Sequence, residues 1–231
     1  MVSIILPCYK EEEHLRESIA ELNRVSKSFD FEHEFIFVDD FSPDKTVAIL
    51  KEFEGQGSRS KFVYHTRNTG RGGAIKSGYA VAEGDLIGYL DIDLEISPLY
   101  ISEMVAKLET YDVVIGNRSY FSQISFNSLL RNVLSRMYKR ISRGVLKHPY
   151  ADTEVGFKFF RRDKVVSFFL EVQNDHWFWD TEFMMLAFKN KLKVCELRVE
   201  FIRNKRKTST VNLYSDTRKY VKELYRYKRR M

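Results

Sequence analysis

Three carboxylates follow the apolar run Leu86–Leu90 at alternate positions, namely Asp91, Asp93 and Glu95. On an extended backbone, residues two and four positions apart project to the same face, so these side chains would point one way. Grouped negative charge at the end of a buried strand is costly unless a cation accompanies it. Because no His or Cys is close in the sequence, oxygen ligands predict Mg2+ or Mn2+ rather than zinc. The alternative is an acidic turn without a metal.

Short apolar runs alternate with segments of helical periodicity around these carboxylates. We expect strands at residues 2–6, 34–39, 61–65, 86–90 and 112–115, and helices at 11–28, 46–53, 70–82 and 98–108. This alternation predicts an α/β fold with a mainly parallel central sheet and helices on both faces. The second half is less regular. There we expect strands at 156–161 and 194–199, and helices at 126–145, 180–189 and 213–228.

Polar residues follow each predicted strand of the first half. Ligands of open parallel sheets bind beyond the carboxyl ends of the strands, so these residues would meet at one edge. They are Pro7, Tyr9, Glu11, Asp39, Asp40, residues 68–73, Asp91, Asp93 and residues 116–118. Their clustering predicts a single binding site.

The charge of the chain is concentrated in its last residues. Residues 204–231 contain ten Lys or Arg against Asp216 and Glu223, so this tail carries +8. Because the whole chain carries +6, residues 1–203 carry −2. A basic tail predicts an anionic partner such as a membrane surface or a phosphate group. The sequence has no recognisable nucleic-acid module, and the acids of the first half would repel a nucleic-acid backbone, so we expect no nucleic-acid partner.

The cysteines and the apolar segments indicate a cytoplasmic protein. Cys8 and Cys195 lie far apart and have no metal-ligand spacing, which is typical of a reducing compartment. The run at residues 2–6 is too short for a signal peptide, and no apolar stretch has the length of a membrane span. Contact with a membrane would then be peripheral, at its cytoplasmic face, or through a membrane-protein partner.

The glycine motif Gly70-Arg71-Gly72-Gly73 opens a predicted helix. It is not a Walker loop, because Ile75 stands where the glycine before Lys76-Ser77 would be required. It also follows the third strand, whereas a dinucleotide fingerprint follows the first. A helix N-terminus together with Arg71 would attract a diphosphate. A plain turn of small residues is the alternative.

Taken in order, seven segments resemble glycosyltransferase family 2 enzymes of the GT-A fold. The first four carry the family pattern, and the last three resemble the branch that makes polyprenyl-phosphate sugars, the dolichyl-phosphate mannose and glucose synthases. The segments are residues 7–11, 38–46, 68–74, 91–93, 114–118, 155–161 and 179–182. The resemblance covers residues 1–203, which we expect to be the catalytic domain. Residues 204–231 would form a basic helical tail that packs on this domain or lies at a membrane surface.

The resemblance implies a role for each matching residue. Asp91 and Asp93 would bind ribose, diphosphate and metal, and Glu95, where these synthases often have Gln, would be a third metal ligand. The remaining positions divide by ligand. The nucleoside would be held by Pro7, Tyr9, Glu11 and Asp39, the acceptor phosphate by Arg118 and Arg131, and the diphosphate by Arg203 or Lys205. Trp177 and Trp179 would cover the sugar or anchor the protein at a lipid interface.

The implied reaction is inverting and depends on a divalent metal, which stabilises the departing nucleoside diphosphate. We expect a hexose from a UDP- or GDP-sugar to be transferred to a polyprenyl (dolichyl-type) phosphate. For a hydroxyl acceptor, which is the alternative, Asp180 would be the general base, with Asp93 as its catalytic partner at the leaving group. A phosphate acceptor is already largely anionic, so Asp180 would then position groups. Asp180 and Glu182 could also simply complement the helix dipole, and a non-catalytic binding protein is the alternative from another class.

Overall fold

The computed structural model describes residues 1–55, 59–120, 140–176, 178–202 and 213–230. Within these residues the chain forms one seven-stranded sheet in the order β3-β2-β1-β4-β6-β5-β7. In chain order, the strands are β1 (Val2–Cys8), β2 (His33–Asp39), β3 (Ser60–Tyr64), β4 (Leu86–Leu90), β5 (Val113–Tyr120), β6 (Phe157–Arg161) and β7 (Val194–Phe201).

The sheet is mainly parallel, as the alternation of strands and helices predicts. β1 pairs in parallel with β2 and β4, β2 with β3, and β5 with β7. β6 is antiparallel to both of its neighbours, β4 and β5. Parallel strands covered on both faces have continuous apolar sequences, and in β1 the consecutive residues Ile4, Ile5 and Leu6 are all fully buried.

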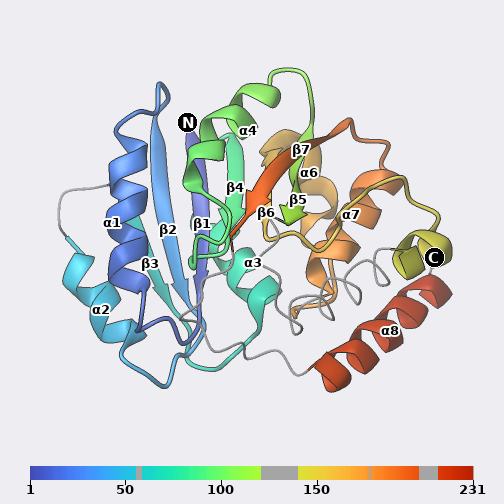
Figure 1. Cartoon of the computed structure of the whole chain (residues 1–231), viewed down its shortest axis with the longest axis horizontal. Coiled ribbons are helices and arrows are strands. Elements are labelled where there is room, and N and C mark those ends of the chain that lie inside the picture. The colour runs from blue at the N-terminus through green and yellow to red at the C-terminus, as the bar shows by residue number, and fades with distance from the viewer. Residues whose placement is uncertain (56–58, 121–139, 177, 203–212, 231) are drawn as a thin grey trace.

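Helices cover both faces of this sheet (Figure 1). α3 packs against β1 and β2, whereas α4 packs against β5 and β6. In chain order, the structure gives α1 (Leu15–Ser26), α2 (Thr46–Phe53), α3 (Arg71–Val81), a short 3₁₀ turn at Pro98–Tyr100, α4 (Ile101–Lys107), α6 (Arg162–Phe169), α7 (Trp179–Lys189) and α8 (Leu213–Arg230).

The predicted elements agree with the structure best where periodicity is strong. The predicted bounds of α2 and β4 are those of the structure. β5 and β7 run further than predicted, to Tyr120 and Phe201, because they pair with each other along their whole length. α6 was not predicted, since it follows β6 without a break and has no turn residue to mark its start. Of the predicted helix at 126–145, only residues 140–145 are described, and residues 140–146 are helical.

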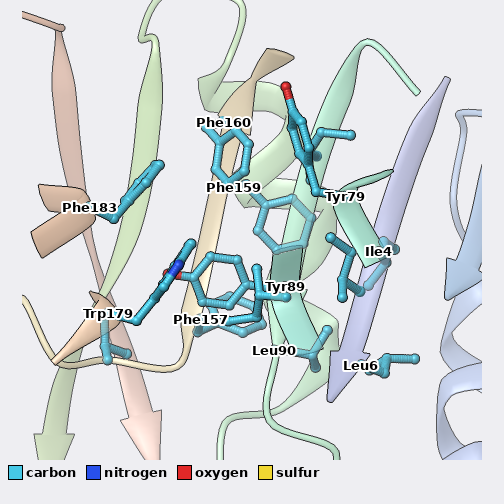
Figure 2. Close-up of a cluster of buried hydrophobic side chains, with 14 of the residues drawn as sticks. Ile4, Leu6, Tyr79, Tyr89, Leu90, Phe157, Phe159, Phe160, Trp179 and Phe183 are labelled. Atoms are coloured by element: carbon cyan, nitrogen blue, oxygen red, sulfur yellow. The ribbon is translucent and has the colours of Figure 1, made fainter. Parts of the chain in front are cut away.

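An aromatic cluster fills the core between β4, β6 and α7 (Figure 2). Trp179 is fully buried and stacks on Phe183 with ring centroids 5.4 Å apart, and its ring meets the Tyr89 ring edge-on. The expectation that Trp179 covers the sugar or anchors the protein in lipid was therefore wrong, because the first turn of α7 faces the core. Trp177 lies outside the described residues.

The C-terminal helix α8 rests on the start of α7. Leu224 and Tyr227 are buried, and the Phe178 ring lies 5.5 Å from that of Tyr220 and 5.9 Å from that of Tyr227. Lys222, Arg226 and Arg229 are exposed on the same helix. The apolar side of α8 thus meets the protein, and basic side chains face solvent. Of the helices that the structure describes, none combines the length and the apolar character that crossing a membrane requires.

Candidate active site

The chain turns directly after β4. The strand ends at Leu90, the amide of Leu94 donates to the carbonyl of Asp91 at 3.2 Å, and Leu94 has a φ of 51°. The expectation that Asp91, Asp93 and Glu95 project to one face of an extended strand was therefore wrong. Alternation of side chains holds only while the backbone stays extended, and here it coils into a turn.

Asp91, Asp93 and Glu95 nevertheless line the same small pocket. The enclosed volume is about 20 Å³, which is room for about one water-sized particle. Arg118, Gly156 and Phe201 also line this pocket. Within the described part of the chain, no three His, Cys, Asp or Glu side chains are gathered closely enough to hold a metal. The oxygen donors still suit Mg2+, which usually takes one or two carboxylates and completes its shell with substrate phosphates and water.

Arg71, the first residue of α3, joins two carboxylates from distant parts of the chain. Its Nε donates to Asp91 Oδ1 at 2.9 Å, and its Nη1 donates to Asp180 Oδ2. Burial by itself would lower the pKa of Arg71, but the charges of Asp180 and Asp91 outweigh it and raise that pKa. Nη2 is buried and has no hydrogen-bond partner among the described residues. Arg71 is therefore a fixed cation with one donor left for a ligand.

Asp180 lies buried at the start of α7 and accepts two further hydrogen bonds. One comes from the Tyr89 hydroxyl at 2.7 Å and the other from Lys158 Nζ at 2.6 Å. Lys158 is fully buried in β6, and its Nζ also donates to the carbonyl of Val155. Burial lowers the pKa of Lys158, although Asp180 opposes this shift. Sequence reasoning did not single out Lys158, yet a lysine among the apolar residues of the strand Phe157–Arg161 was the available signal.

The backbone amides at the start of α3 are already satisfied by the protein. Gly72 N and Gly73 N donate to the carbonyl of Asp175 at 2.8 Å and 3.2 Å. Gly70, with a φ of 85°, has no room for a side chain, since a Cβ would lie 2.5 Å from that carbonyl. The amides of Gly72 and Gly73 are therefore not available to a diphosphate, and the role expected for the Arg71 side chain stays a prediction.

The ends of β1 and β2 carry the predicted nucleoside residues. Asp39 is buried; its Oδ2 accepts from Ser42 N at 3.0 Å, whereas its Oδ1 has no hydrogen-bond partner within the described residues. Glu11 is also buried, with Oε2 2.5 Å from His14 Nε2. Pro7 is partly exposed at the end of β1, and the Tyr9 side chain beyond it is 40% exposed. These residues lie at one edge of the sheet. Asp39 Oδ1 is a buried acceptor there that has no hydrogen-bond partner among the described residues.

Asp40, the neighbour of Asp39, has a structural task. It accepts hydrogen bonds from Thr69 N at 2.7 Å and Gly70 N at 2.8 Å, and its Oδ1 lies 2.8 Å from His65 Nδ1. Asp40 thus ties the glycine motif to the end of β2. Asp40 lies directly after β2 and holds this loop, whereas Asp39 keeps a buried oxygen, Oδ1, that has no hydrogen-bond partner among the described residues.

Arg118 lies near the end of β5 and is held by a buried carboxylate. Its Nε donates to Asp152 Oδ2 at 2.7 Å and its Nη2 donates to Asp152 Oδ1 at 2.9 Å. Asp152 is fully buried, and the Arg118 side chain is 17% exposed. Sequence reasoning missed Asp152, which has no helical or strand pattern around it. Three predicted phosphate ligands, Arg131, Arg203 and Lys205, lie outside the described residues.

Comparison with known proteins identifies the family. Residues 3–169 match the model of glycosyl transferase family 2. The chain is 28% identical over 204 residues to the glycosyltransferase AglD of Haloferax volcanii, covering 87% of this chain and 33% of that protein. It is 29% identical over 215 residues to the dolichyl-phosphate beta-glucosyltransferase ALG5D of Trichomonas vaginalis, covering 87% and 65%. The chain therefore spans between a third and two thirds of the length of these relatives.

Solved structures with the same fold come from bacterial enzymes. Glucosyl-3-phosphoglycerate synthase from Mycobacterium tuberculosis, in complex with Mg2+ and UDP, superposes with a TM-score of 0.69 at 18% identity, covering 96% of this chain and 76% of that one. TarS from Staphylococcus aureus, in complex with UDP-GlcNAc, gives 0.61 at 16% identity, covering 96% and 65%. At these identities the likeness concerns the fold, which is GT-A.

Proposed function

Since this chain belongs to glycosyltransferase family 2, we propose that it transfers a hexose from UDP to a polyprenyl phosphate, with inversion and with the help of a divalent metal. The observation that carries this proposal is the pocket in which Asp91, Asp93 and Arg118 meet. It combines carboxylates suited to a metal-bound diphosphate with an arginine suited to a second phosphate.

The nucleoside would bind at the ends of β1 and β2, between Pro7, Tyr9, Glu11 and Asp39. The buried Oδ1 of Asp39 supports this proposal, because a buried acceptor without a partner is costly and an N–H of the base would satisfy it. Uridine is proposed because both solved relatives named above hold UDP or a UDP-sugar. Glucose is the first sugar to test, since one of the relatives is a dolichyl-phosphate beta-glucosyltransferase.

The leaving diphosphate would lie between Asp93 and Arg71. One or two of the pocket carboxylates Asp91, Asp93 and Glu95 would hold Mg2+ or Mn2+, which would neutralise the charge that develops on the leaving group. Arg71 would donate its buried Nη2 to a phosphate oxygen, while its other two nitrogen atoms stay on Asp91 and Asp180. Arg203 and Lys205 are proposed as further diphosphate ligands.

The acceptor phosphate would meet Arg118, with Arg131 as a proposed second ligand. The pairing of Arg118 with Asp152 fixes the plane of the guanidinium, whose fork of donors matches phosphate oxygens. Asp180 accepts hydrogen bonds from Arg71, Tyr89 and Lys158, so it is poorly available as a proton acceptor. This favours a phosphate acceptor, which needs no general base because it is already largely anionic at neutral pH.

The basic outer side of α8 would hold the enzyme at the cytoplasmic face of a membrane. Figure 1 shows α8 at the end of the molecule to which β1 runs from the N-terminus, the end at which the parallel strands present the site. Lys222, Arg226 and Arg229 are exposed there, and each basic residue near an anionic surface contributes about 1 kcal/mol to membrane binding.

Transfer of radiolabel to lipid tests the proposed function. The purified chain is mixed with radiolabelled UDP-glucose, dolichyl phosphate and Mn2+, and the label that partitions into organic solvent is counted. We expect lipid-linked label that disappears with EDTA and returns with excess Mn2+. GDP-mannose and soluble oligosaccharides serve as parallel arms. Label found in an oligosaccharide and none in lipid would contradict the proposed acceptor and establish the hydroxyl alternative.

A further inference from the structure

We infer that Lys158 is a positioning residue for the transfer reaction, which acts through Asp180 to hold Arg71 against Asp91, a carboxylate that lines the pocket. This inference rests on the proposed function and adds to it. Lys158 is not among the residues that line the pocket, and its side chain is fully buried. Its effect on the reaction would therefore pass through the side chains that it contacts.

Four charged side chains of alternating sign connect Lys158 to the pocket. Lys158 Nζ lies 2.6 Å from Asp180 Oδ1, Asp180 Oδ2 accepts from Arg71 Nη1, and Arg71 Nε lies 2.9 Å from Asp91 Oδ1. These residues come from β6, α7, α3 and the end of β4. Each inner charge has an opposite charge on both sides, so the row is neutral as a whole.

The strand register explains how Lys158 reaches this position. In the antiparallel pair of β4 and β6, Lys158 stands opposite Tyr89. Its ammonium group lies 5.5 Å from the centroid of the Tyr89 ring, and the hydroxyl of that ring donates to Asp180. Lys158 and Tyr89 therefore fix the same carboxylate oxygen, Oδ1, and leave Oδ2 for Arg71. Because Oδ1 is occupied in this way, Arg71 Nη1 binds Oδ2 of Asp180.

Removal of the Lys158 charge would change the position of Arg71. Asp180 would then have Arg71 as its one remaining cation among its described contacts, and the guanidinium would be drawn toward Asp180 and away from Asp91. A buried lysine is expensive to retain, since taking an ammonium out of water costs several kcal/mol. A leucine or methionine of similar volume would fill the same space without this cost in free energy. The charge of Lys158 is therefore best explained by its contact with the carboxylate of Asp180.

The site geometry also limits how far Arg71 can move. A Cβ on Gly156 would lie 2.5 Å from Arg71 Nη2 and 2.0 Å from Asp91 Oδ2. The backbone of Gly156 thus borders the very atom that we propose to donate to the diphosphate. A shift of Arg71 by about 1 Å would misplace Nη2, and misplacement on this scale costs up to about a hundredfold in rate.

UDP binding in the presence of Mn2+ tests the inference without relying on turnover. Calorimetric titrations are made with wild type, Lys158→Met, Lys158→Arg and Lys164→Met, which alters a lysine that is 44% exposed on α6. We expect Lys158→Met to weaken UDP binding about tenfold, Lys158→Arg to recover part of this loss, and Lys164→Met to bind as wild type. In kinetic assays, KM for the donor should rise while KM for the lipid acceptor stays unchanged.

A double variant separates positioning from a general loss of stability. If Lys158 acts through Asp180, Asp180→Asn weakens UDP binding by itself, and Lys158→Met added to it has no further effect. A further tenfold loss in the double variant would overturn the inference, as would a folded Lys158→Met protein that binds UDP as wild type does. If Lys158→Met fails to fold, the double variant carries the test, because it removes the positive charge of Lys158 and the negative charge of Asp180 together. Failure of wild type itself to bind UDP would instead overturn the proposed function.

Discussion

The two arginines of the site are held in different ways. Arg71 lies within a row of charges that is buried except at Asp91, and it is bonded to Asp91 and to Asp180, which Lys158 and Tyr89 hold in turn. Arg118 lines the pocket itself and is held by two hydrogen bonds to the carboxylate of Asp152. The first arrangement spans four elements of the fold, whereas the second joins one strand to the segment before β6.

This difference separates residues that mainly stabilise the fold from residues that mainly bind substrate. In the Arg71 row each charge depends on its neighbours, so a loss at any point leaves a buried charge without compensation. Arg118 retains 17% exposure and borders the pocket, so it can be rehydrated when its partner is removed. Changes near Arg71 should therefore reduce both stability and donor binding, and changes near Arg118 should fall more on the acceptor.

The largest expected effect tests the Arg71 row. Asp180→Ala leaves Lys158 and Arg71 buried without the carboxylate that joins them, which should lower the free energy of unfolding by about 3–5 kcal/mol. Urea unfolding at neutral pH measures this change. Asp163→Ala, at an exposed carboxylate of α6, is the control and should change stability by less than about 0.5 kcal/mol. Equal losses in the two variants would contradict the view that the Arg71 row depends on the Asp180 carboxylate for its stability.

The next effect tests the Arg118 side. Asp152→Ala removes a buried carboxylate with two charged hydrogen bonds, and we expect a loss of about 2–3 kcal/mol in the free energy of unfolding. Because the arginine then loses its orientation, KM for the lipid phosphate should rise about tenfold while UDP binding stays the same. Steady-state kinetics with each substrate varied in turn gives both values. A change confined to the donor would show that Asp152 serves the other side of the site.

A pH effect is expected on the Arg118 side, where His148 lies four residues before Asp152. Burial, assisted by Arg143, lowers the pKa of His148 to about 4, whereas an unfolded histidine titrates near about 6.5. As the pH falls from about 6.5 to 4, the unfolded chain binds a proton that the folded chain does not, so stability is lost. Between pH 7.5 and pH 5 the loss should be about 2 kcal/mol. Denaturant unfolding at both pH values measures it.

The variant His148→Gln isolates this contribution. Its amide can keep a hydrogen bond to Ser142 Oγ, which lies 3.0 Å from His148 Nε2, but it cannot take up a proton. We expect the variant to lose about 2 kcal/mol less than wild type between the same two pH values. An identical pH dependence in the two proteins would assign the acid sensitivity to other groups.

The smallest effect on stability comes from Gly156, which borders both Asp91 and Arg71. Gly156→Ala brings a methyl group within 2.0 Å of Asp91 Oδ2. Since Asp91 is half exposed and can move, we expect a loss of only about 1 kcal/mol, together with weaker UDP binding. Gly144→Ala, where a Cβ meets nothing within 4 Å, is the matched control. It lies in a helical segment and should stabilise by up to about 1 kcal/mol.

The sequence by itself predicted the alternation of strands and helices, the edge where polar residues gather, and the family. These features depend on local periodicity and on residue types that follow each strand. It also predicted Asp39, Asp91 and Arg118 as site residues, whose roles stay predictions. It failed after Leu90, because an alternating pattern of carboxylates does not reveal that the backbone has left the extended conformation.

The tertiary structure decided which charges meet. β6 comes after β5 in the chain but lies between β4 and β5 in the sheet, antiparallel to both. That insertion sets Lys158 opposite Tyr89 and beneath Asp180, and Arg71 meets Asp180 across 109 positions of sequence. Ion pairs between residues so far apart leave no periodic pattern in the sequence, because the order and register of the strands determine which residues meet. The polar residues at the strand ends could therefore be named from the sequence, whereas the network of ion pairs behind them could not.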